Sequence, residues 1–354
     1  MIKKSSLIFI FLLVVVLMTA CNNMVDNKPE EPSANIDKEL IEEQPEPIIE
    51  VEIIKEPEGK PSPLSGIYTD EETLKNRIMA ISFDNHPKAR WQAGLKDAEI
   101  VYEFPVEGPY TRYLGLYIIN EPISVGPIRS ARPYLVTMAY EFDAVFVHVG
   151  GSEQAKKDVR NLDMAEIDGL TSSSKVFWRQ SPKTAPNNMY SSMEVLRQAQ
   201  KDRGFRAEGE YEGFSFDFDD MNRTGDSAKK VTIIYNNENN TGYEYDSVNN
   251  CYNRFKDGEV HIDEIDESQI IAKNIIIQKA NMKVLDGEGR LAITLETTGE
   301  GLFITKGVVN EIKWVKDNRK ARTKYLDLNG EEIKLNPGTT WIQVVKPSTE
   351  IIIE

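Results

Sequence analysis

Cysteine and histidine are scarce in this sequence, with two cysteines and three histidines among 354 residues. If Cys21 carries a lipid, as argued below, Cys251 has no partner and the chain forms no internal disulfide. A zinc site would need His86 and His148 together with a carboxylate, and their spacing matches no zinc motif. We therefore expect neither a metal nor another cofactor.

Motifs of nucleophilic catalysis are also missing. The sequence contains no Gly-x-Ser-x-Gly and no His-Glu-x-x-His, the patterns of α/β-hydrolases and zinc peptidases. Cys251 has only His261 near it along the chain, which argues against a cysteine peptidase or transpeptidase. Carboxylate pairs of the glycosidase type can be found in any chain this acidic, so they favour no mechanism.

Positive charge is in short supply as well. The chain has 42 Lys and Arg against 57 Asp and Glu, a formal net charge of −15. Such a chain is repelled by nucleic acids and by anionic lipid surfaces, although a local basic cluster can still bind an anion. We expect no nucleic-acid partner.

The long apolar run near the N-terminus is too short to span a bilayer. Two lysines precede the apolar residues 7–18, and Thr-Ala-Cys follows at 19–21, whereas a spanning helix needs about 20 apolar residues. This is the pattern of a bacterial lipoprotein signal, with Met18 where leucine is more usual. We expect residues 1–20 to be a signal peptide and Cys21 to carry the lipid that holds the protein on the outer face of the cell membrane. An ordinary secretory signal with an incidental cysteine is the alternative.

The segment after Cys21 is acidic and rich in proline. Residues 22–63 contain twelve acidic residues, four lysines and seven prolines. This composition cannot bury enough apolar surface to fold. We expect residues 21–63 to form the lipidated cysteine and a self-repelling tether.

Two regions of different periodicity follow the tether. In the first, β-branched and aromatic runs predict strands at 77–83, 98–104, 111–119 and 143–150, and apolar periodicity predicts helices at 131–142, 152–162 and 191–204. In the second, strand patterns are broken by Asn, Asp-Gly and Gly turns. The sequence predicts an α+β protein, with a mixed α/β domain at 64–205, a connecting segment at 206–228 and a smaller antiparallel β-rich domain at 229–354.

Two arginines flank a predicted helix start in VGPIRSARPY. Arg129 and Arg132 lie on either side of Ser130, although a helix N-terminus already carries about half a positive charge. We expect a negatively charged group to offset the charges of these two arginines. An external anion is one answer, and the carboxylates Asp84, Glu103 and Glu107 are the internal alternative.

A second helix start follows a predicted strand in VHVGGSEQ. The strand ends near His148, Gly150 and Gly151 allow a bend, and Ser152 opens the helix. Backbone N–H groups at such a turn commonly hold phosphate, sulfate or carboxylate. An ordinary tight turn is the alternative.

Polar side chains gather in two further loops. FDNHPKARWQAGL presents Asp84, Asn85, His86 and Arg90 directly after a strand, where binding sites are often built, although a solvated turn has the same composition. SPKTAPNNMYSS presents Asn188 ahead of a helix, and an ordinary helix entry is the alternative there.

These stretches, with AEIVYEFPVEGPYTRYLGLY, resemble the YerB-like bacterial lipoproteins in sequence and in order. The resemblance covers nearly the whole chain after the tether and implies two domains without an assigned activity. Asn187 stands where the family often has histidine, which weakens any mechanism that needs one there. The residues that carry the resemblance are Asn85, His86, Pro87, Ala89, Arg90, Glu103, Glu107, Thr111, Arg112, Gly126, Arg129, Ser130, Arg132, Ala185, Pro186, Asn188 and Tyr190.

Arginine-rich, nucleophile-poor motifs suit recognition better than bond cleavage. We therefore expect a ligand-binding or scaffold protein of the cell envelope whose partner is an anionic or glycan ligand or an envelope protein. A hydrolase of wall polymer with a carboxylate and His86 as acid and base, and motifs that only stabilise the fold, are the alternatives. The expected polar cleft is lined by Asn85, His86, Arg90, Arg112, Arg129, Ser130, Arg132 and Asn188, and the acid, base or ion-pair candidates are Asp84, Glu103, Glu107 and His148.

Overall fold

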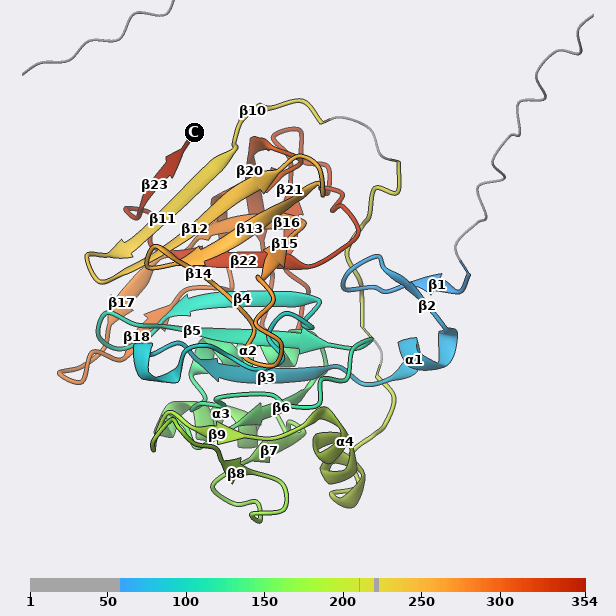
Figure 1. Cartoon of the computed structure of the whole chain (residues 1–354), viewed down its shortest axis with the longest axis vertical. Helices are drawn as coiled ribbons and strands as arrows, with labels where there is room; N and C mark the ends of the chain where they lie inside the picture. Colours follow the sequence, from blue (N-terminus) through green and yellow to red (C-terminus); the bar gives the residue numbers. More distant parts are fainter. Residues whose placement is uncertain (1–57, 210, 220–222) are drawn as a thin grey trace, which may run out of the picture. The chain divides into compact units, whose positions relative to one another are not determined.

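The computed structural model describes residues 58–209, 211–219 and 223–354. The expected signal peptide, Cys21 and most of the expected tether lie outside these residues. In the described ranges no helix is long and apolar enough to cross a bilayer. The described chain is mostly β-structure with few helices (Figure 1).

Strands of the N-terminal region form one half of a large mixed sheet. β5 lies between β3 and β4 and runs antiparallel to both, whereas β3, β6 and β7 run parallel to one another. β3 and β5 are buried along their whole length because both faces of the sheet are covered. The bounds are β3 (Met79–Asp84), β4 (Ile100–Pro105), β5 (Thr111–Tyr117), β6 (Val145–His148) and β7 (Glu166–Asp168).

The other half of this central sheet comes from later in the chain. It consists of β10 (Asp226–Ser227), β16 (Asn274–Lys279), β19 (Thr298–Thr305), β20 (Val308–Val315), β21 (Lys324–Leu326) and β22 (Thr340–Val345). The strand order is β10-β20-β19-β16-β22-β4-β5-β3-β6-β7, and β21 pairs with β20. The central sheet therefore runs across both regions of the sequence.

The central sheet takes strands from both the region expected to be a mixed α/β domain, 64–205, and the region expected to be an antiparallel β-rich domain, 229–354. β22 lies between β16 and β4 and runs parallel to both. All six residues of β22 are buried, as in a strand at the centre of a sheet. Within the expected connecting segment at 206–228, β10 pairs with β20.

A second, antiparallel sheet is built from the C-terminal region alone. Its order is β14-β13-β12-β11-β23, with β15 paired to β13. Val231, Tyr243 and Tyr252 of this sheet pack with Val101 and Trp341 of the central sheet in one hydrophobic core. The bounds are β11 (Lys230–Asn236), β12 (Asn239–Asp246), β13 (Cys251–Lys256), β14 (Glu259–Val260), β15 (Ile271–Ala272) and β23 (Glu350–Ile353).

The helices begin at the capping signals that the sequence shows. Ser152 and Ser192 accept hydrogen bonds from backbone N–H groups in the first turns of α3 (Glu153–Asn161) and α4 (Met193–Asp202). α2 (Pro133–Glu141) has proline in its first turn, where a missing N–H costs nothing, and α1 (Glu71–Lys75) is capped by Asp70. Apolar residues of α2 and α3 belong to the core on one face of the central sheet, and those of α4 belong to the core on the other.

Short elements complete the fold, and one of them shortens the expected tether. β1 (Lys60–Pro61) pairs with β2 (Tyr68–Thr69), and the hydroxyls of Ser62 and Ser65 donate to the buried carboxylate of Glu99 at 2.5 and 2.7 Å. Residues 60–63, expected to be tether, are therefore part of the fold. The remaining pairs are β8 (Trp178–Arg179) with β9 (Met189–Tyr190) and β17 (Met282–Val284) with β18 (Leu291–Ile293), and η1 (Pro87–Ala89) is a single 3-10 turn.

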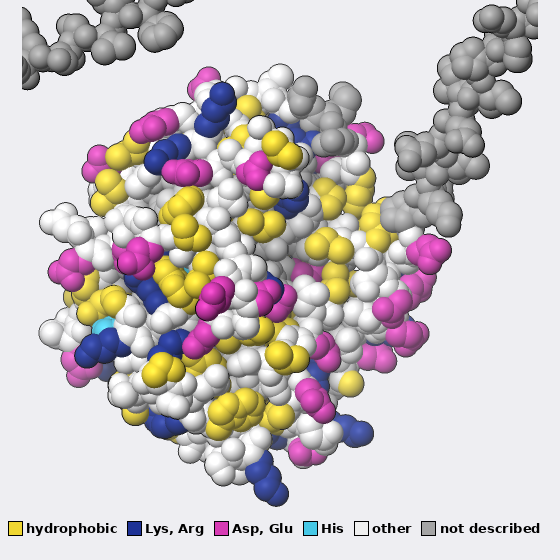
Figure 2. All heavy atoms as spheres, in the orientation of Figure 1, with side chains coloured by type: hydrophobic (Ala, Val, Ile, Leu, Met, Phe, Trp, Pro, Cys, Tyr) yellow, Lys and Arg dark blue, Asp and Glu magenta, His cyan; other side chains and the backbone are white. Residues whose placement is uncertain are grey.

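The surface carries both signs of charge. Figure 2 shows lysine, arginine and acidic side chains interspersed on one face, with acidic side chains gathered over the part that Figure 1 labels α1. Asp70, Glu71 and Glu72 contribute to this acidic part. Figure 2 shows no large basic area on this face, so the face offers no extended surface for a polyanion.

Candidate functional site

Several of the sequence motifs meet at the carboxyl ends of β3 and β6. Asp84 ends β3 and stands opposite Arg112 in the register with β5. The N-termini of α2 and α3 lie side by side here because Ala131 and Gly151 form a bridge, with the Ala131 N–H donating to the Gly150 carbonyl at 2.8 Å. Such edges of parallel strands are where α/β sheets commonly bind ligands. We call Arg112, Arg129 and Arg132, with Asp84 and Glu107, the arginine cluster.

An internal carboxylate neutralises Arg132. Its Nε and Nη2 donate to the two oxygens of Glu107 at 2.6 and 2.8 Å, a bidentate pair. Burial alone would raise the pKa of Glu107, but the hydrogen bond and charge of Arg132 lower it. Arg132 is also the N-cap residue of α2, and no side chain caps this helix. Pro133 has no N–H, so Tyr134 and Leu135 supply the first-turn N–H groups of α2 that no helix carbonyl accepts.

Arg129 is neutralised only loosely. Its Nε lies 3.4 Å from Oδ2 of Asp84, and its side chain remains 29% exposed. That Asp84 oxygen also accepts a hydrogen bond from the Asn187 amide at 2.7 Å, while Oδ1 accepts from the His86 backbone at 3.1 Å. Asp84 therefore divides its charge among several donors.

Arg112 is a buried cation without a carboxylate. It is 5% exposed, and Nη1 donates to the Ser130 carbonyl at 2.6 Å. Its Nε is buried with no hydrogen-bond partner, and among the described residues no carboxylate oxygen lies within 4.0 Å of its guanidinium. Burial, and next the charge of Arg132, lower the pKa of Arg112 to about 10. A buried charge left in this state is costly unless something pairs with it.

His86 borders the cluster at the N-cap of η1. Its Nδ1 accepts a hydrogen bond from the Lys88 backbone at 3.0 Å, and its ring lies 4.4 Å from the ring of Tyr110. Burial lowers the pKa of His86, and nearby cations lower it further, although Asp84 acts in the opposite direction. The ring is therefore neutral at pH 7.

Asn85 and Arg90 are engaged away from the cluster. The amide of Asn85 donates to Thr111 at 2.7 Å and accepts from Nε of Arg90 at 3.1 Å. Arg90 in turn pairs with Asp257, beyond the end of β13, at 2.6 Å. Arg90 thus connects this loop to the second sheet, and Asn85 holds Arg90 through its side-chain oxygen.

The glycine turn before α3 is already occupied by an internal anion. Gly150 has φ +66°, and its N–H donates to the carboxylate of Asp168 at 2.7 Å. The buried ring of His148 lies between the Gly150 carbonyl and Glu166, at 2.9 Å from each. Ser152 caps α3 through the Ala155 N–H at 3.3 Å. Of the backbone donors that the sequence suggested for an external anion, the N–H groups of Gly150 and Ser152 thus bond within the protein.

Glu103 lies away from the cluster, inside the packing between the two sheets. It is fully buried and pairs with Arg254 at 2.5 Å and Lys256 at 3.0 Å, both from β13. Burial alone would raise the pKa of Glu103, but the charges of Lys256 and Arg254 and a hydrogen bond from Thr111 lower it to about 2. Such a carboxylate stays ionised and cannot serve as a general acid at neutral pH.

The sequence did not point to Arg254 and Lys256, although a signal was present. They occupy alternate positions of β13 and so share one face with the buried Tyr252. Charges on the inward face of a strand indicate a buried counter-ion.

Asn188 has a local role, because its amide donates to the carbonyls of Gln180 and Lys183 at 3.2 and 2.9 Å.

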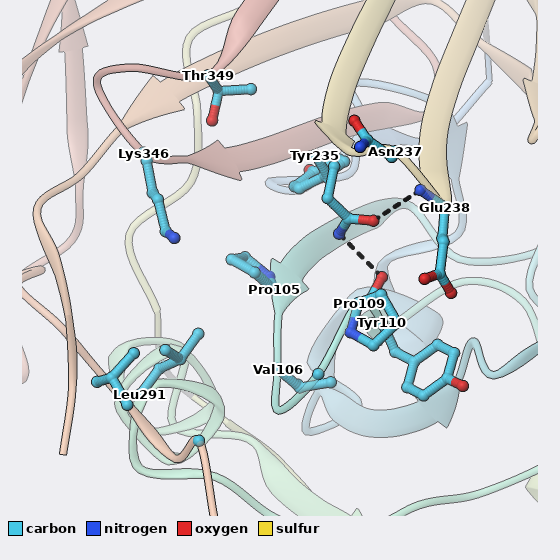
Figure 3. Close-up of a pocket in the computed structure, with 14 residues that line it drawn as sticks. Pro105, Val106, Pro109, Tyr110, Tyr235, Asn237, Glu238, Leu291, Lys346 and Thr349 are labelled. Carbon is cyan, nitrogen blue, oxygen red and sulfur yellow. Dashed lines mark hydrogen bonds between the residues drawn. The ribbon is translucent and has the colours of Figure 1, made fainter. Parts of the chain in front are cut away.

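A cavity of about 560 Å³ lies beside the β4–β5 loop (Figure 3). We call it the hairpin cavity, since the β17–β18 hairpin and the turn between β11 and β12 form two of its walls. It is lined by Pro105, Val106, Gly108, Pro109, Tyr110, Tyr235, Asn236, Asn237, Glu238, Val284, Gly289, Leu291, Lys346 and Thr349. The described residues include no group of three or more His, Cys, Asp and Glu side chains that could hold a metal ion.

Both regions of the chain match one protein family. Residues 64–206 match the "Protein of unknown function (DUF3048) N-terminal domain", and residues 231–342 match its C-terminal domain. The chain belongs to the DUF3048 family. A relative from Bacillus subtilis (strain 168), named "Putative lipoprotein YerB", is 34% identical over 288 residues, which are 80% of this chain and 86% of the relative.

A solved structure shows the same fold. The crystal structure of YerB protein from Bacillus subtilis has a TM-score of 0.76 to this chain at 34% identity, covering 82% of this chain and 99% of the other. The resemblance expected from the motifs is thereby confirmed. The name of the relative agrees with a membrane-anchored place in the cell envelope, and the DUF3048 descriptions assign no activity.

Proposed function

We propose that this protein is a ligand-binding lipoprotein, anchored through Cys21 to the outer face of the cell membrane, whose arginine cluster holds an anion. The observation that carries the proposal is Arg112, a buried guanidinium with an unpaired Nε and no carboxylate within 4.0 Å among the described residues. Buried charges are normally paired.

The surroundings of Arg112 favour an oxyanion. The cluster holds three arginines against two carboxylates, so one positive charge is left over. The uncapped N-terminus of α2 adds N–H donors and a partial positive charge beside it. Phosphate and carboxylate groups accept several hydrogen bonds at once, so one such group would satisfy both the Arg112 guanidinium and the N–H donors of α2.

Pairing with internal carboxylates, the alternative to an external anion, accounts for only part of the charge of the three arginines. Glu107 neutralises Arg132, and Asp84 partly neutralises Arg129, but neither lies within 4.0 Å of Arg112. The hydrolase alternative cannot use Glu103 as its acid or base, because Glu103 is fully buried between two cations. A scaffold role would use the same cluster for an acidic group of an envelope protein.

Titration of the full chain with inorganic phosphate tests this proposal. Arg112→Met should raise the dissociation constant for phosphate roughly 10- to 100-fold, because a charge-assisted hydrogen bond contributes about 1.5–3 kcal/mol. Without phosphate the variant should melt no lower than the wild type, since no carboxylate loses its partner. Isothermal titration calorimetry and thermal melting provide the two measurements.

Arg160→Met is the matched control, because Arg160 is exposed in the last turn of α3. It should leave phosphate binding unchanged. The proposal is wrong if the wild type binds no phosphate, or if Arg112→Met binds it as tightly as the wild type does. A large fall in melting temperature for Arg112→Met would instead indicate that the arginine stabilises the fold.

A further inference from the structure

We infer that the hairpin cavity binds the saccharide part of the same ligand, so that the ligand is a sugar carrying a phosphate. The phosphate part of this ligand rests on the proposed function. The saccharide part rests on the lining of the cavity. A volume of about 560 Å³ is that of a small-molecule site and exceeds what one phosphate fills.

The cavity adjoins the arginine cluster through a shared wall. The β4–β5 loop contributes Val106, Pro109 and Tyr110 to the lining of the cavity. The same loop carries Glu107, which pairs with Arg132 on the cluster side. Tyr110 also contacts the ring of His86, whose backbone N–H donates to Asp84 of the cluster. The β4–β5 loop therefore borders both the cavity and the cluster.

The lining combines apolar surface with a cationic, an anionic and several uncharged polar side chains. Pro105, Val106 and Leu291 present apolar surface, which suits the C–H faces of a sugar ring. In Figure 3 the amine of Lys346 points into the cavity, and Glu238 lies on the opposite side. Neither of these two exposed side chains forms an ion pair with a described residue.

The presence of both charges on the walls argues against an occupant that carries charge of one sign only. A cationic ligand would be repelled by Lys346, and an anionic one by Glu238. Hydroxyl groups both donate and accept hydrogen bonds, so one saccharide can bond to the lysine, to the carboxylate and to the side-chain amide of Asn237. This is the pattern expected for an uncharged, polyhydroxylated part of a ligand.

Calorimetric titration of the full chain with three probes tests the inference. The probes are inorganic phosphate, glucose 1-phosphate and methyl glucoside. We expect glucose 1-phosphate to bind at least 10-fold more tightly than inorganic phosphate. In the double variant Glu238→Ala with Lys346→Ala, this advantage should disappear while the affinity for inorganic phosphate stays unchanged. Both side chains are exposed, so the variant keeps the core intact.

A double variant on α4, Glu194→Ala with Lys201→Ala, removes the same two side-chain types from exposed positions and should change nothing. Equal affinities for glucose 1-phosphate and phosphate would overturn this inference and leave the anion site intact. Failure of the wild type to bind either phosphate compound would overturn the proposed function itself. Binding of methyl glucoside as tight as that of glucose 1-phosphate would contradict a joint ligand.

Discussion

Replacing Glu103 with glutamine is expected to lower the free energy of unfolding by about 3–5 kcal/mol, because it leaves two buried cations without their carboxylate. Glu103, Arg254 and Lys256 are all fully buried. Glutamine keeps the size of the side chain, so the loss reports charge and hydrogen bonding and not a cavity. Urea unfolding of the full chain measures it.

The exposed pair of Lys230 and Glu244 is the control for Glu103. These side chains lie 2.9 Å apart across β11 and β12 and are 52% and 48% exposed. Glu244→Gln should therefore cost no more than about 1 kcal/mol. A loss at Glu103 as small as the loss at Glu244 would show that the buried ion pairs contribute little to joining the two sheets.

The stability that Glu103 provides should also depend on pH. Its pKa in the folded protein is about 2, below the ordinary value of 4.5. As the pH falls, Glu103 is therefore protonated in the unfolded chain before it is protonated in the folded protein. The stability that its ion pairs provide is fully present above about pH 4.5 and is lost as the pH falls toward 2. The gap in unfolding free energy between wild type and Glu103→Gln should narrow over that range, and a gap that stays constant would contradict the ion-pair account.

Replacing Lys316 with methionine is expected to cost a similar amount, about 3–5 kcal/mol. Its amine lies 2.6 Å from the carboxylate of Glu141 at the end of α2, and the two side chains are 1% and 0% exposed. The Thr323 N–H and hydroxyl also donate to Glu141, at 2.7 and 2.9 Å. Removing the lysine leaves a buried carboxylate on the helix whose other end borders the arginine cluster.

The double variant Glu141→Gln with Lys316→Met separates charge from packing. It should recover much of the stability lost by Lys316→Met, because no charge then remains unpaired. Thermal and urea unfolding of the two variants provide the comparison. A double variant that is less stable than Lys316→Met would mean that Glu141 stabilises the fold mainly through its bonds to Thr323.

The sequence predicted those parts of the fold that depend on local signals. Pro133, Ser152 and Ser192 mark the starts of α2, α3 and α4 within two residues of the expected positions. The place of β22 could not be predicted in this way. It pairs with β4, more than 230 residues earlier in the chain, and a buried strand shows no alternation that would reveal its partner or its direction.

The same contrast applies to the candidate site. The sequence presented Arg129 and Arg132 as cations in need of a counter-charge, with Asp84 and Glu107 among the internal candidates, and the structure pairs them in this way. It could not show that Arg112 is left over, because that depends on distances between β5, β3 and the loop before α2. Nor could it show that Glu103 of β4 pairs with β13, whose Arg254 lies 151 residues further along the chain.

Diffraction from crystals of this protein soaked in selenate is the most direct test of an anion site, because the anomalous signal of selenium locates the ion. The account predicts a selenate within hydrogen-bond distance of Nε of Arg112 and near the N-terminus of α2. An Arg112 whose Nε bonds to a protein carboxylate, with no selenate at the arginine cluster, would contradict it.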